Sequence, residues 1–404
     1  MTERIPRIRG GTPLLSLVLL VIFIDSIGYG VVVPVLPIYG RELGLSDFKL
    51  GVLFATYAIA LLVFAIPVGM LADRWGRKPF ILFGMFAMAG AFVFYALARG
   101  YTMLMVARAL DGATAAANWV AALALLGDRT PESEMGEKMG WAIAGMAIGG
   151  IAGPLLGGVL SDTLGYRAPF LAIAGACVLG GLMSLLLVEE KSTVRREQFS
   201  FTALLGPVLR SRSVLIACLI TVVTTTGFGL LEPTLPIYLK STFSMSRTMI
   251  GVVFGVTMAA YAVASPLAGR LSDAVGRRRP ILAGLVLTAV VAPLVVVFES
   301  RAAVLVLMGV LGACIAVFET PSVPLITDSL GGAAYGTAFG LLNFSWSLGY
   351  ALGPLLGGAV KQALGLLAAL LLYSGLLAVL VVVVALVLKD GSPAGLNGRA
   401  GTSP

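Results

Sequence analysis

The chain alternates long apolar runs with short polar breaks along almost its whole length. Each apolar run holds about 20 residues or more, the length that a helix needs to cross the hydrocarbon core of a bilayer. The pattern therefore predicts an all-α membrane protein with about 12 transmembrane helices. These helices are expected at roughly residues 14–39, 47–72, 79–98, 102–127, 137–160, 167–188, 214–239, 247–271, 280–298, 302–327, 335–360 and 363–388.

Composition agrees with a lipid environment. Of the 404 residues, 58% are hydrophobic and only 12% are charged, whereas soluble domains carry about 25% charged residues. Three cysteines, Cys177, Cys218 and Cys314, fall inside predicted helices, which favours neither a disulfide framework nor a metal site. The chain has no histidine, so proton exchange near neutral pH must use carboxyl groups.

Several motifs occur twice, at an offset of about 200 residues. GMLADRWGRKP at 69–79 returns as GRLSDAVGRRRP at 269–280, and IAGPLLGG at 151–158 returns as ALGPLLGG at 351–358. Repeats of this size are typical of secondary transporters built from two halves. We expect two six-helix, pseudo-symmetric halves at 1–188 and 214–388, a cytoplasmic linker at 189–213 and a disordered tail at 389–404.

Positive charges gather on one side of the predicted bundle. Lysines and arginines are concentrated before the first helix and after the second, sixth and eighth helices, and they are sparse in the opposite loops. The positive-inside rule then places both termini in the cytoplasm of a multi-pass protein of the inner (plasma) membrane. Topology is sufficient to explain the net charge of +8, so no nucleic-acid partner is expected. We further expect a monomer in the lipid bilayer.

Three motifs resemble those of the major facilitator superfamily, in particular its drug–proton antiporters. On the fourth helix, Arg108-Ala109-Leu110-Asp111-Gly112 matches a family motif that often has Gln at the place of Asp111. The other two are the loop motif Gly69-x-Leu71-Ala72-Asp73-Arg74-x-Gly76-Arg77-Lys78 and the antiporter motif Gly149-x-x-x-Gly153-Pro154-x-x-Gly157-Gly158.

A narrower resemblance is to the vesicular monoamine transporters and their bacterial relatives. It rests on DSIGYGVVVPVLP in the first helix and on LEPTLPI, which contains Glu232, in the seventh. The first of these stretches equally resembles the tetracycline efflux proteins. The chain departs from the monoamine pattern at Tyr57, where that family has a lysine, and at Asn343, where it has an aspartate.

Five ionisable residues lie well inside predicted membrane spans, and all five are on the first, fourth, seventh and tenth helices. They are Asp25, Arg108, Asp111, Glu232 and Glu319. Each costs about 2.5–3.5 kcal/mol at the bilayer centre on insertion scales, so these side chains must face one another or water. The resemblance implies that these four helices line a central cavity. A structural Arg108–Asp111 ion pair is the alternative interpretation.

A carboxyl group in such a place can take up a proton from one side of the membrane and release it to the other. When it is ionised it also attracts a cation, and competition between the proton and the cation gives exchange. We expect Asp25, Glu232 and Glu319 to carry protons, substrate charge or both. We expect Arg108, Asp111 and Asn343 to tune their surroundings.

Aromatic side chains complete the predicted substrate site. The monoamine-transporter resemblance implies substrate contacts at Tyr261 and Tyr350, and further candidates are Tyr29, Tyr57, Phe228 and Trp346. An aromatic ring attracts an organic cation by about 0.5–2 kcal/mol. The alternative is that each ring only packs or faces lipid.

The resemblance also implies a gate and a hinge. In the family, the acid and arginines of the loop motif latch the two halves when the transporter opens outward. The gate candidates are Gly69, Asp73, Arg74, Gly76, Arg77, Asp273 and Arg277, although the arginines are equally explained as topology signals. The hinge candidates are Gly153, Pro154, Gly353 and Pro354, for which helix packing is the alternative role.

The sequence thus favours a proton-coupled antiporter that exports lipophilic organic cations, amines or drugs by alternating access. One alternative is a proton symporter for a small metabolite, and another is a non-transporting receptor or scaffold with the same fold. An enzyme is not expected, because the sequence offers no nucleophile–base pair, no metal-ligand spacing and no sign of a cofactor.

Overall fold

The computed structural model describes residues 11–187, 211–330 and 335–388, and every element in these ranges is a helix. The predicted tail and the predicted linker up to residue 210 lie outside the described residues. The first six helices are α1 (Gly11–Glu42), α2 (Asp47–Trp75), α3 (Lys78–Leu97), α4 (Tyr101–Arg129), α5 (Glu132–Leu164) and α6 (Arg167–Leu187). The remaining helices are α8 (Arg212–Phe243), α9 (Arg247–Val275), α10 (Arg278–Val297), α11 (Arg301–Glu319), α12 (Ser322–Leu330), α13 (Tyr335–Leu364) and α14 (Leu366–Val387).

Eleven of the spans in the described part of the chain are long and apolar enough to cross a membrane, and α13 occupies the position of the remaining predicted one. The all-α membrane fold predicted from the sequence is confirmed. The predicted tenth segment is interrupted, because α11 ends at Glu319 and α12 begins at Ser322. Pro321 lies at this break and has no N–H to continue the helical hydrogen bonds.

The same local signals begin and end corresponding helices in the two repeats. Ser46 caps α2 by accepting a hydrogen bond from the backbone N–H of Lys49, and Ser246 caps α9 in the same way. Gly76 and Gly276 follow these helices with φ of 92° and 83°, a conformation that favours glycine. The repeat in the sequence is therefore a repeat in local structure.

The interior contains two hydrophobic clusters. One is formed mainly by α1 to α6 and the other mainly by α8 to α14. The exceptions lie on α1 and α8, because Val33 and Ile38 belong to the second cluster and Ile237 belongs to the first. Burial of apolar surface thus stabilises each group of helices separately and also joins them along α1 and α8.

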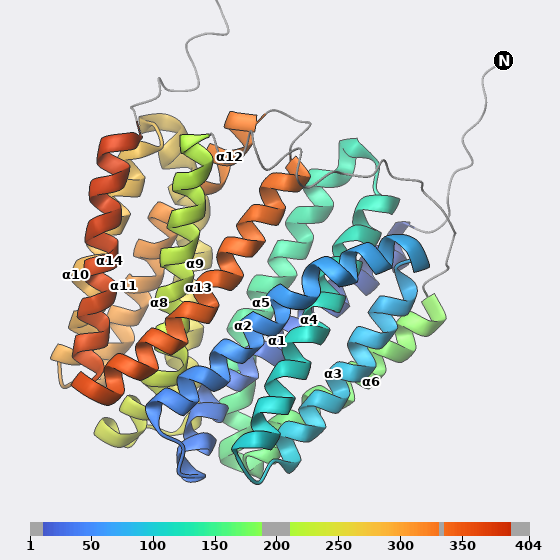
Figure 1. Ribbon diagram of the computed structural model, residues 1–404, viewed down its shortest axis with the longest axis horizontal. Coiled ribbons are helices and arrows are strands. Elements are labelled where there is room, and N and C mark those ends of the chain that lie inside the picture. Colours follow the sequence, from blue (N-terminus) through green and yellow to red (C-terminus); the bar gives the residue numbers. More distant parts are fainter. Residues whose placement is uncertain (1–10, 188–210, 331–334, 389–404) are drawn as a thin grey trace, which may run out of the picture.

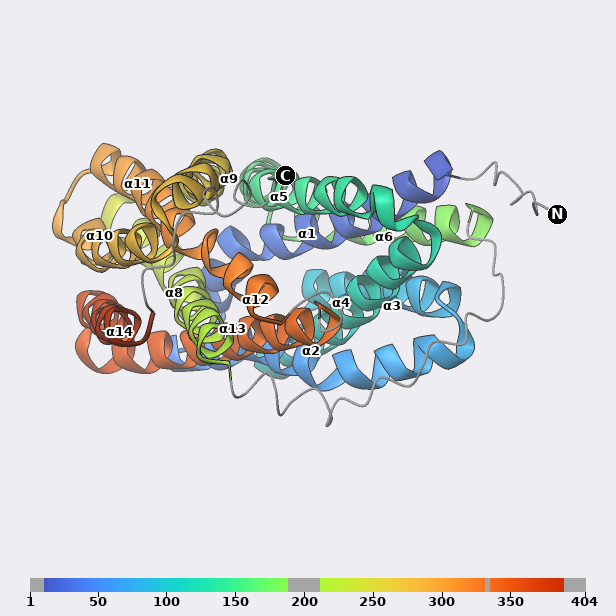
Figure 2. The ribbon, with the colours of Figure 1, turned by 90° about the horizontal axis from the view of Figure 1, so that it is seen from above.

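The two groups of helices also meet where α2 crosses α13 and where α5 lies beside α9 (Figures 1 and 2). Glycines permit both contacts. A Cβ atom added at Gly51 would lie 2.2 Å from the carbonyl oxygen of Pro354, and one added at Gly251 would lie 2.2 Å from that of Pro154. These equivalent contacts give the molecule an approximate two-fold symmetry.

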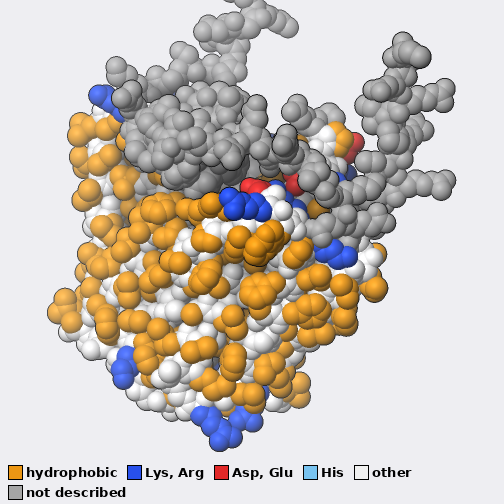
Figure 3. Space-filling model, turned by 45° about the vertical axis from the view of Figure 1, so that its right-hand side comes forward, with side chains coloured by type: hydrophobic (Ala, Val, Ile, Leu, Met, Phe, Trp, Pro, Cys, Tyr) orange, Lys and Arg blue, Asp and Glu red, His pale blue; other side chains and the backbone are white. Residues whose placement is uncertain are grey.

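The outer surface suits lipid. Hydrophobic side chains cover the middle of the face in Figure 3, and lysines and arginines lie toward its ends. Large apolar side chains such as Ile66, Leu186 and Leu386 are 62%, 81% and 81% exposed. Exposed apolar area of this extent is expected of a surface surrounded by acyl chains.

Candidate functional site

Glu232 lies where the two groups of helices meet. This α8 residue is only 5% exposed. Its Oε2 accepts a hydrogen bond of 2.6 Å from the phenol of Tyr29 on α1. The positive charge of Arg108 on α4 also acts on this carboxylate. Three predicted site residues from three helices are therefore brought together.

Arg108 is buried against aromatic rings. Its guanidinium carbon lies 5.3 Å from the ring centroid of Tyr29, 4.8 Å from that of Phe54 and 4.6 Å from that of Tyr57. Cation–π attraction to these rings offsets part of the cost of burying the charge. Phe54 was missed in the sequence analysis, although it lies one turn before Tyr57 on α2, so its spacing could have indicated a shared face.

Arg108 and Asp111 also form the ion pair that the sequence analysis considered. Nη1 of Arg108 lies 3.2 Å from Oδ2 of Asp111, and both side chains are almost fully buried. Tyr95 of α3 donates a hydrogen bond of 3.0 Å to the same oxygen. Because pairing and hydrogen bonding both favour the ionised carboxylate, Asp111 is positioned as the structural partner of Arg108.

Asp25 is held by two uncharged donors of α4. It is 3% exposed. Its Oδ1 accepts from Nδ2 of Asn118 at 3.1 Å, and its Oδ2 accepts from Nε1 of Trp119 at 2.8 Å. The sequence analysis missed both donors. The available signal was spacing, since Trp119 follows Arg108 by three turns and lies on the same face of α4.

Glu319 lies at the end of α11, half-buried, with Tyr261 of α9 as a side-chain hydrogen-bond partner. Tyr350 of α13 interacts electrostatically with both carboxylates and with Tyr261. Tyr350 therefore relates the two glutamates, whereas Tyr261 acts on Glu319.

Four of the six predicted aromatic residues form one cluster. The ring of Tyr29 lies 5.0 Å from that of Tyr57 and 6.1 Å from that of Tyr350, and Tyr350 lies 4.2 Å from Trp346. The cluster combines rings from α1, α2 and α13 around Arg108 and Glu232. Phe228 instead packs, partly buried, against the core of the second half, and Asn343 is exposed on α13.

The gate candidates lie at the ends of α2 and α9. Asp73 pairs with Arg77, which in turn lies 3.2 Å from Asp128 of α4. These contacts stay within the first half. Asp73, Arg74 and Asp273 are exposed, whereas Arg277 is half-buried. Gly69 faces α4, where Val120 lies 3.6 Å from the position of an added Cβ.

The hinge candidates make very close helix contacts. A Cβ at Gly30 of α1 would lie 2.8 Å from Cδ of Pro154, and a Cβ at Gly229 of α8 would lie 2.8 Å from Cδ of Pro354. Gly353 faces the carbonyl of Thr226 on α8. Since the carbonyls of both prolines face glycines of the opposite half, these motifs link packing within each half to contact between halves.

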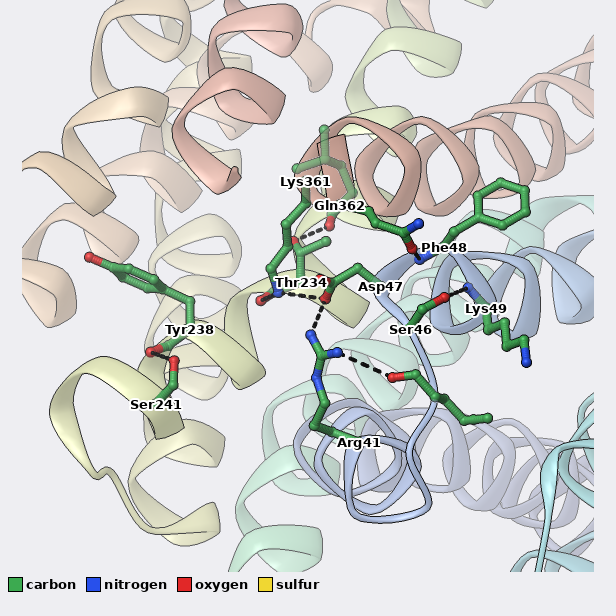
Figure 4. Close-up of polar contacts among 12 residues, drawn as sticks. Arg41, Ser46, Asp47, Phe48, Lys49, Thr234, Tyr238, Ser241, Lys361 and Gln362 are labelled. Carbon is green, nitrogen blue, oxygen red and sulfur yellow. Dashed lines mark hydrogen bonds and ion pairs between the residues drawn. The ribbon is translucent and has the colours of Figure 1, made fainter. Parts of the chain in front are cut away.

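Polar contacts join the halves at the end that carries the turns after α1 and α8, and the sequence analysis did not foresee them. Asp47 lies 2.7 Å from Arg41 and 3.1 Å from Lys361, and Gln362 accepts a bond of 3.1 Å from the backbone N–H of Phe48 (Figure 4).

The pseudo-symmetric position has the same arrangement. Asp162 at the end of α5 accepts hydrogen bonds from the backbone N–H groups of Arg247 and Thr248 at the start of α9. Arg247 also pairs with Glu42 at 2.7 Å. Each of α5 and α13 therefore caps the first turn of a helix from the other half.

Within residues 11–187, 211–330 and 335–388, no group of three or more acidic or cysteine side chains is arranged to hold a metal ion. The chemistry that the described site offers is therefore that of buried carboxylates, one guanidinium, and aromatic hydroxyl and indole groups.

Comparison with known proteins agrees with this fold. The family model described as Major Facilitator Superfamily matches residues 18–225 and 217–403. The human synaptic vesicular amine transporter is 29% identical over 335 residues, which are 81% of this chain. The zebrafish (Danio rerio) probable vesicular acetylcholine transporter-B is 26% identical over 87% of this chain and 74% of its own length.

The chain spans only 64% of the length of the human amine transporter. Among solved structures, a bacterial homolog of the human lysosomal transporter Spinster, in an inward-facing and occupied conformation, has a TM-score of 0.82 and 16% identity. That match covers 93% of this chain and 96% of the other. At this identity the likeness concerns the fold alone.

Proposed function

Because the chain belongs to the Major Facilitator Superfamily, a family of membrane transporters and not of enzymes, we propose that it is a proton-coupled antiporter. Its substrates are lipophilic organic cations, amines or drugs, which it exports by alternating access. It works as a monomer in the inner (plasma) membrane with both termini in the cytoplasm.

The observation that carries this proposal is the hydrogen bond between Tyr29 and Glu232. It joins the two halves at a buried carboxylate that lies beside an aromatic cluster. A carboxylate supplies the charge that attracts a cation, and aromatic faces supply both apolar contact and cation–π attraction. An anionic substrate would instead meet three acidic groups, Asp25, Glu232 and Glu319.

Exchange follows from competition at these carboxyl groups. Protonation neutralises the carboxylate and removes the charge that holds the cation, whereas a bound cation favours the ionised form. Because Glu232 contacts α1 of the other half, a change in its charge alters a contact between the parts that must move apart. Arg108, which acts on Glu232 from α4, limits how many positive charges the site accepts.

The proposal is tested by proton flux in proteoliposomes that contain a pH-sensitive dye, with a panel of organic cations, organic anions and neutral drugs. We expect cations, and not anions, to release protons from acid-loaded vesicles. Glu232→Gln removes the charge without changing the shape and should abolish this flux. Glu299→Gln, an exposed residue between α10 and α11, is the matched control and should keep it.

The other outcomes assign other functions. Proton uptake driven by a sugar or amino acid, with no response to cations, would indicate a symporter for a metabolite. A receptor or scaffold would be indicated if the protein is folded but none of these compounds causes proton movement. Full cation-driven flux in Glu232→Gln would remove Glu232 from the mechanism.

A further inference from the structure

The two hydrogen-bond partners of Asp25 differ in what they can do. Nε1 of Trp119 donates to Oδ2 at 2.8 Å, and Nδ2 of Asn118 donates to Oδ1 at 3.1 Å. An indole N–H only donates, whereas a carboxamide carries two donors on one atom and an acceptor on the other. Both donors suit an ionised carboxylate. Only Asn118 also has an oxygen that can accept a hydrogen bond from the O–H of a protonated carboxyl group.

The acceptor of Asn118 has no hydrogen-bond partner within the described part of the chain. Its Oδ1 is buried, and the side chain as a whole is 1% exposed. The oxygen lies against Gly84 of α3, where an added Cβ would come within 2.1 Å of it. A buried acceptor without a donor is unfavourable. A half-turn of the amide would direct Oδ1 at Asp25 and Nδ2 at Gly84.

We propose that the side-chain amide of Asn118 follows the proton on Asp25. While Asp25 is ionised, Nδ2 of Asn118 donates to Oδ1. When a proton binds, it binds to Oδ1, because Trp119 donates to Oδ2 in both states, and the amide turns so that its oxygen accepts the new O–H. Asn118 is thus a positioning residue, and this role rests on the proposed function of Asp25 as a proton carrier.

The groups that face Asp25 make these two donors important. Asp111 of α4, Tyr57 of α2 and Cys177 of α6 interact with it electrostatically, and none of the three supplies positive charge. From α3, Met88 presents only its thioether sulfur, 3.5 Å from Nδ2 of Asn118. The ionised form of Asp25 therefore depends on N–H donors, and the protonated form depends on an acceptor for its O–H.

The direct test is nuclear magnetic resonance of the side-chain amides. The sequence holds three asparagines, Asn118, Asn343 and Asn397, so ¹⁵N labelling of asparagine in liposomes gives a spectrum that Asn343→Gln and Asn397→Gln variants assign. We expect the Asn118 amide signal to change with pH, with the same midpoint as the ¹³C carboxyl signal of Asp25. The change should disappear in Asp25→Asn. An Asn118 signal that stays constant while Asp25 titrates would overturn the proposal.

A transport experiment tests whether Asn118 only donates a hydrogen bond to Asp25 or turns its amide when Asp25 is protonated. Trp119→Phe keeps an aromatic ring but removes a donor that favours the ionised form, so the pH profile of cation-driven flux should move up by about one pH unit. Asn118→Leu removes a partner from both forms of Asp25, so its pH shift should be smaller while turnover falls at every pH. An equal or larger shift in Asn118→Leu would mean that Asn118 only donates, which contradicts the proposal.

The two proposals fail in different ways. Absence of cation-driven proton flux in the unmodified protein would refute the antiporter function, yet the amide signal would still follow the proton on Asp25. Normal flux with a constant amide signal would refute only the switch. If Asn118→Leu does not fold, the proposal is still decided by comparing the pH dependence of the Asn118 amide signal in the unmodified protein with that in Asp25→Asn.

Discussion

Tyr29 is the residue at which several parts of the site meet. Its hydroxyl donates to Glu232, its ring lies 5.0 Å from that of Tyr57, and the guanidinium of Arg108 lies 5.3 Å from its centroid. A phenol can donate to a carboxylate and can also accept from a carboxylic acid. The same side chain therefore has a partner in both charge states of Glu232.

Tyr29→Phe removes the hydroxyl and keeps the ring, so it separates these roles. The hydrogen bond is made to a charged acceptor, which favours the ionised form more than the protonated form. We expect the pH profile of cation-driven flux to move to higher pH, by about one to two units. Tyr238→Phe, whose hydroxyl bonds to the carbonyl of Val296 away from the site, is the control. An unchanged profile in Tyr29→Phe would show that the bond has no role in proton binding.

At the scale of residues, the sequence indicated which charged groups lie inside the helices but not which side chains contact them. Asp25, Glu232 and Arg108 could be found because charges inside apolar runs are rare and must be useful or paired. Asn118, Trp119, Phe54 and Tyr95 were missed, because uncharged polar and aromatic side chains are common in such helices and a shared helix face alone does not single them out. Which of them reaches a carboxylate depends on how α4 is rotated against α1 and α3, and tertiary packing decides that rotation.

At the scale of helices, close contacts depend on glycine and proline. Gly51 on α2 faces the carbonyl of Pro354 on α13, and Gly251 on α9 faces that of Pro154 on α5. Small residues let backbones approach without loss of packing. The repeated motifs in the sequence marked these helices. The identity of the partner across the halves was not visible, because Gly51 and Pro354 are 303 positions apart and Gly251 and Pro154 are 97 apart.

Gly51→Val tests whether this approach sets the conformation. The added side chain cannot fit beside the carbonyl of Pro354, so the halves should separate at the end near α2's first turns. We expect spin-label distances across that end to lengthen and cation-driven flux to fall at least tenfold. In Gly90→Val on α3, an added Cβ meets nothing within 4 Å, and both readouts should remain as in the unmodified protein. Unchanged distances in Gly51→Val would contradict the account.

At the scale of the whole molecule, the two halves are joined at one end by symmetric polar contacts. Asp162 caps the start of α9 and Gln362 caps the start of α2, while Arg247–Glu42 and Lys361–Asp47 add ion pairs. The described contacts of the gate candidate Asp73 remain within one half. Opening of this end must therefore break specific hydrogen bonds and ion pairs.

Arg247→Gln and Lys361→Gln remove the two ion pairs that cross this end. Each pair is partly exposed and contributes about 1 kcal/mol or less, so either change alone should shift the distribution of conformations only a fewfold. Together they should increase labelling of a cysteine placed at Leu155 of α5, which is half-buried against Gly255 of α9. Arg301→Gln, whose partner is the carbonyl of Phe243 in the same half, is the control. Equal labelling in all variants would argue against a latch at this end.

The central claim is that a cation and a proton compete for the same buried carboxyl groups. The most direct measurement adds an organic cation to the purified protein in lightly buffered nanodiscs and counts the protons released as it binds. The account predicts proton release in step with binding, and a smaller release in Glu232→Gln at matched occupancy. Tight binding of the cation with no release of protons over the pH range from 6 to 8 would contradict it.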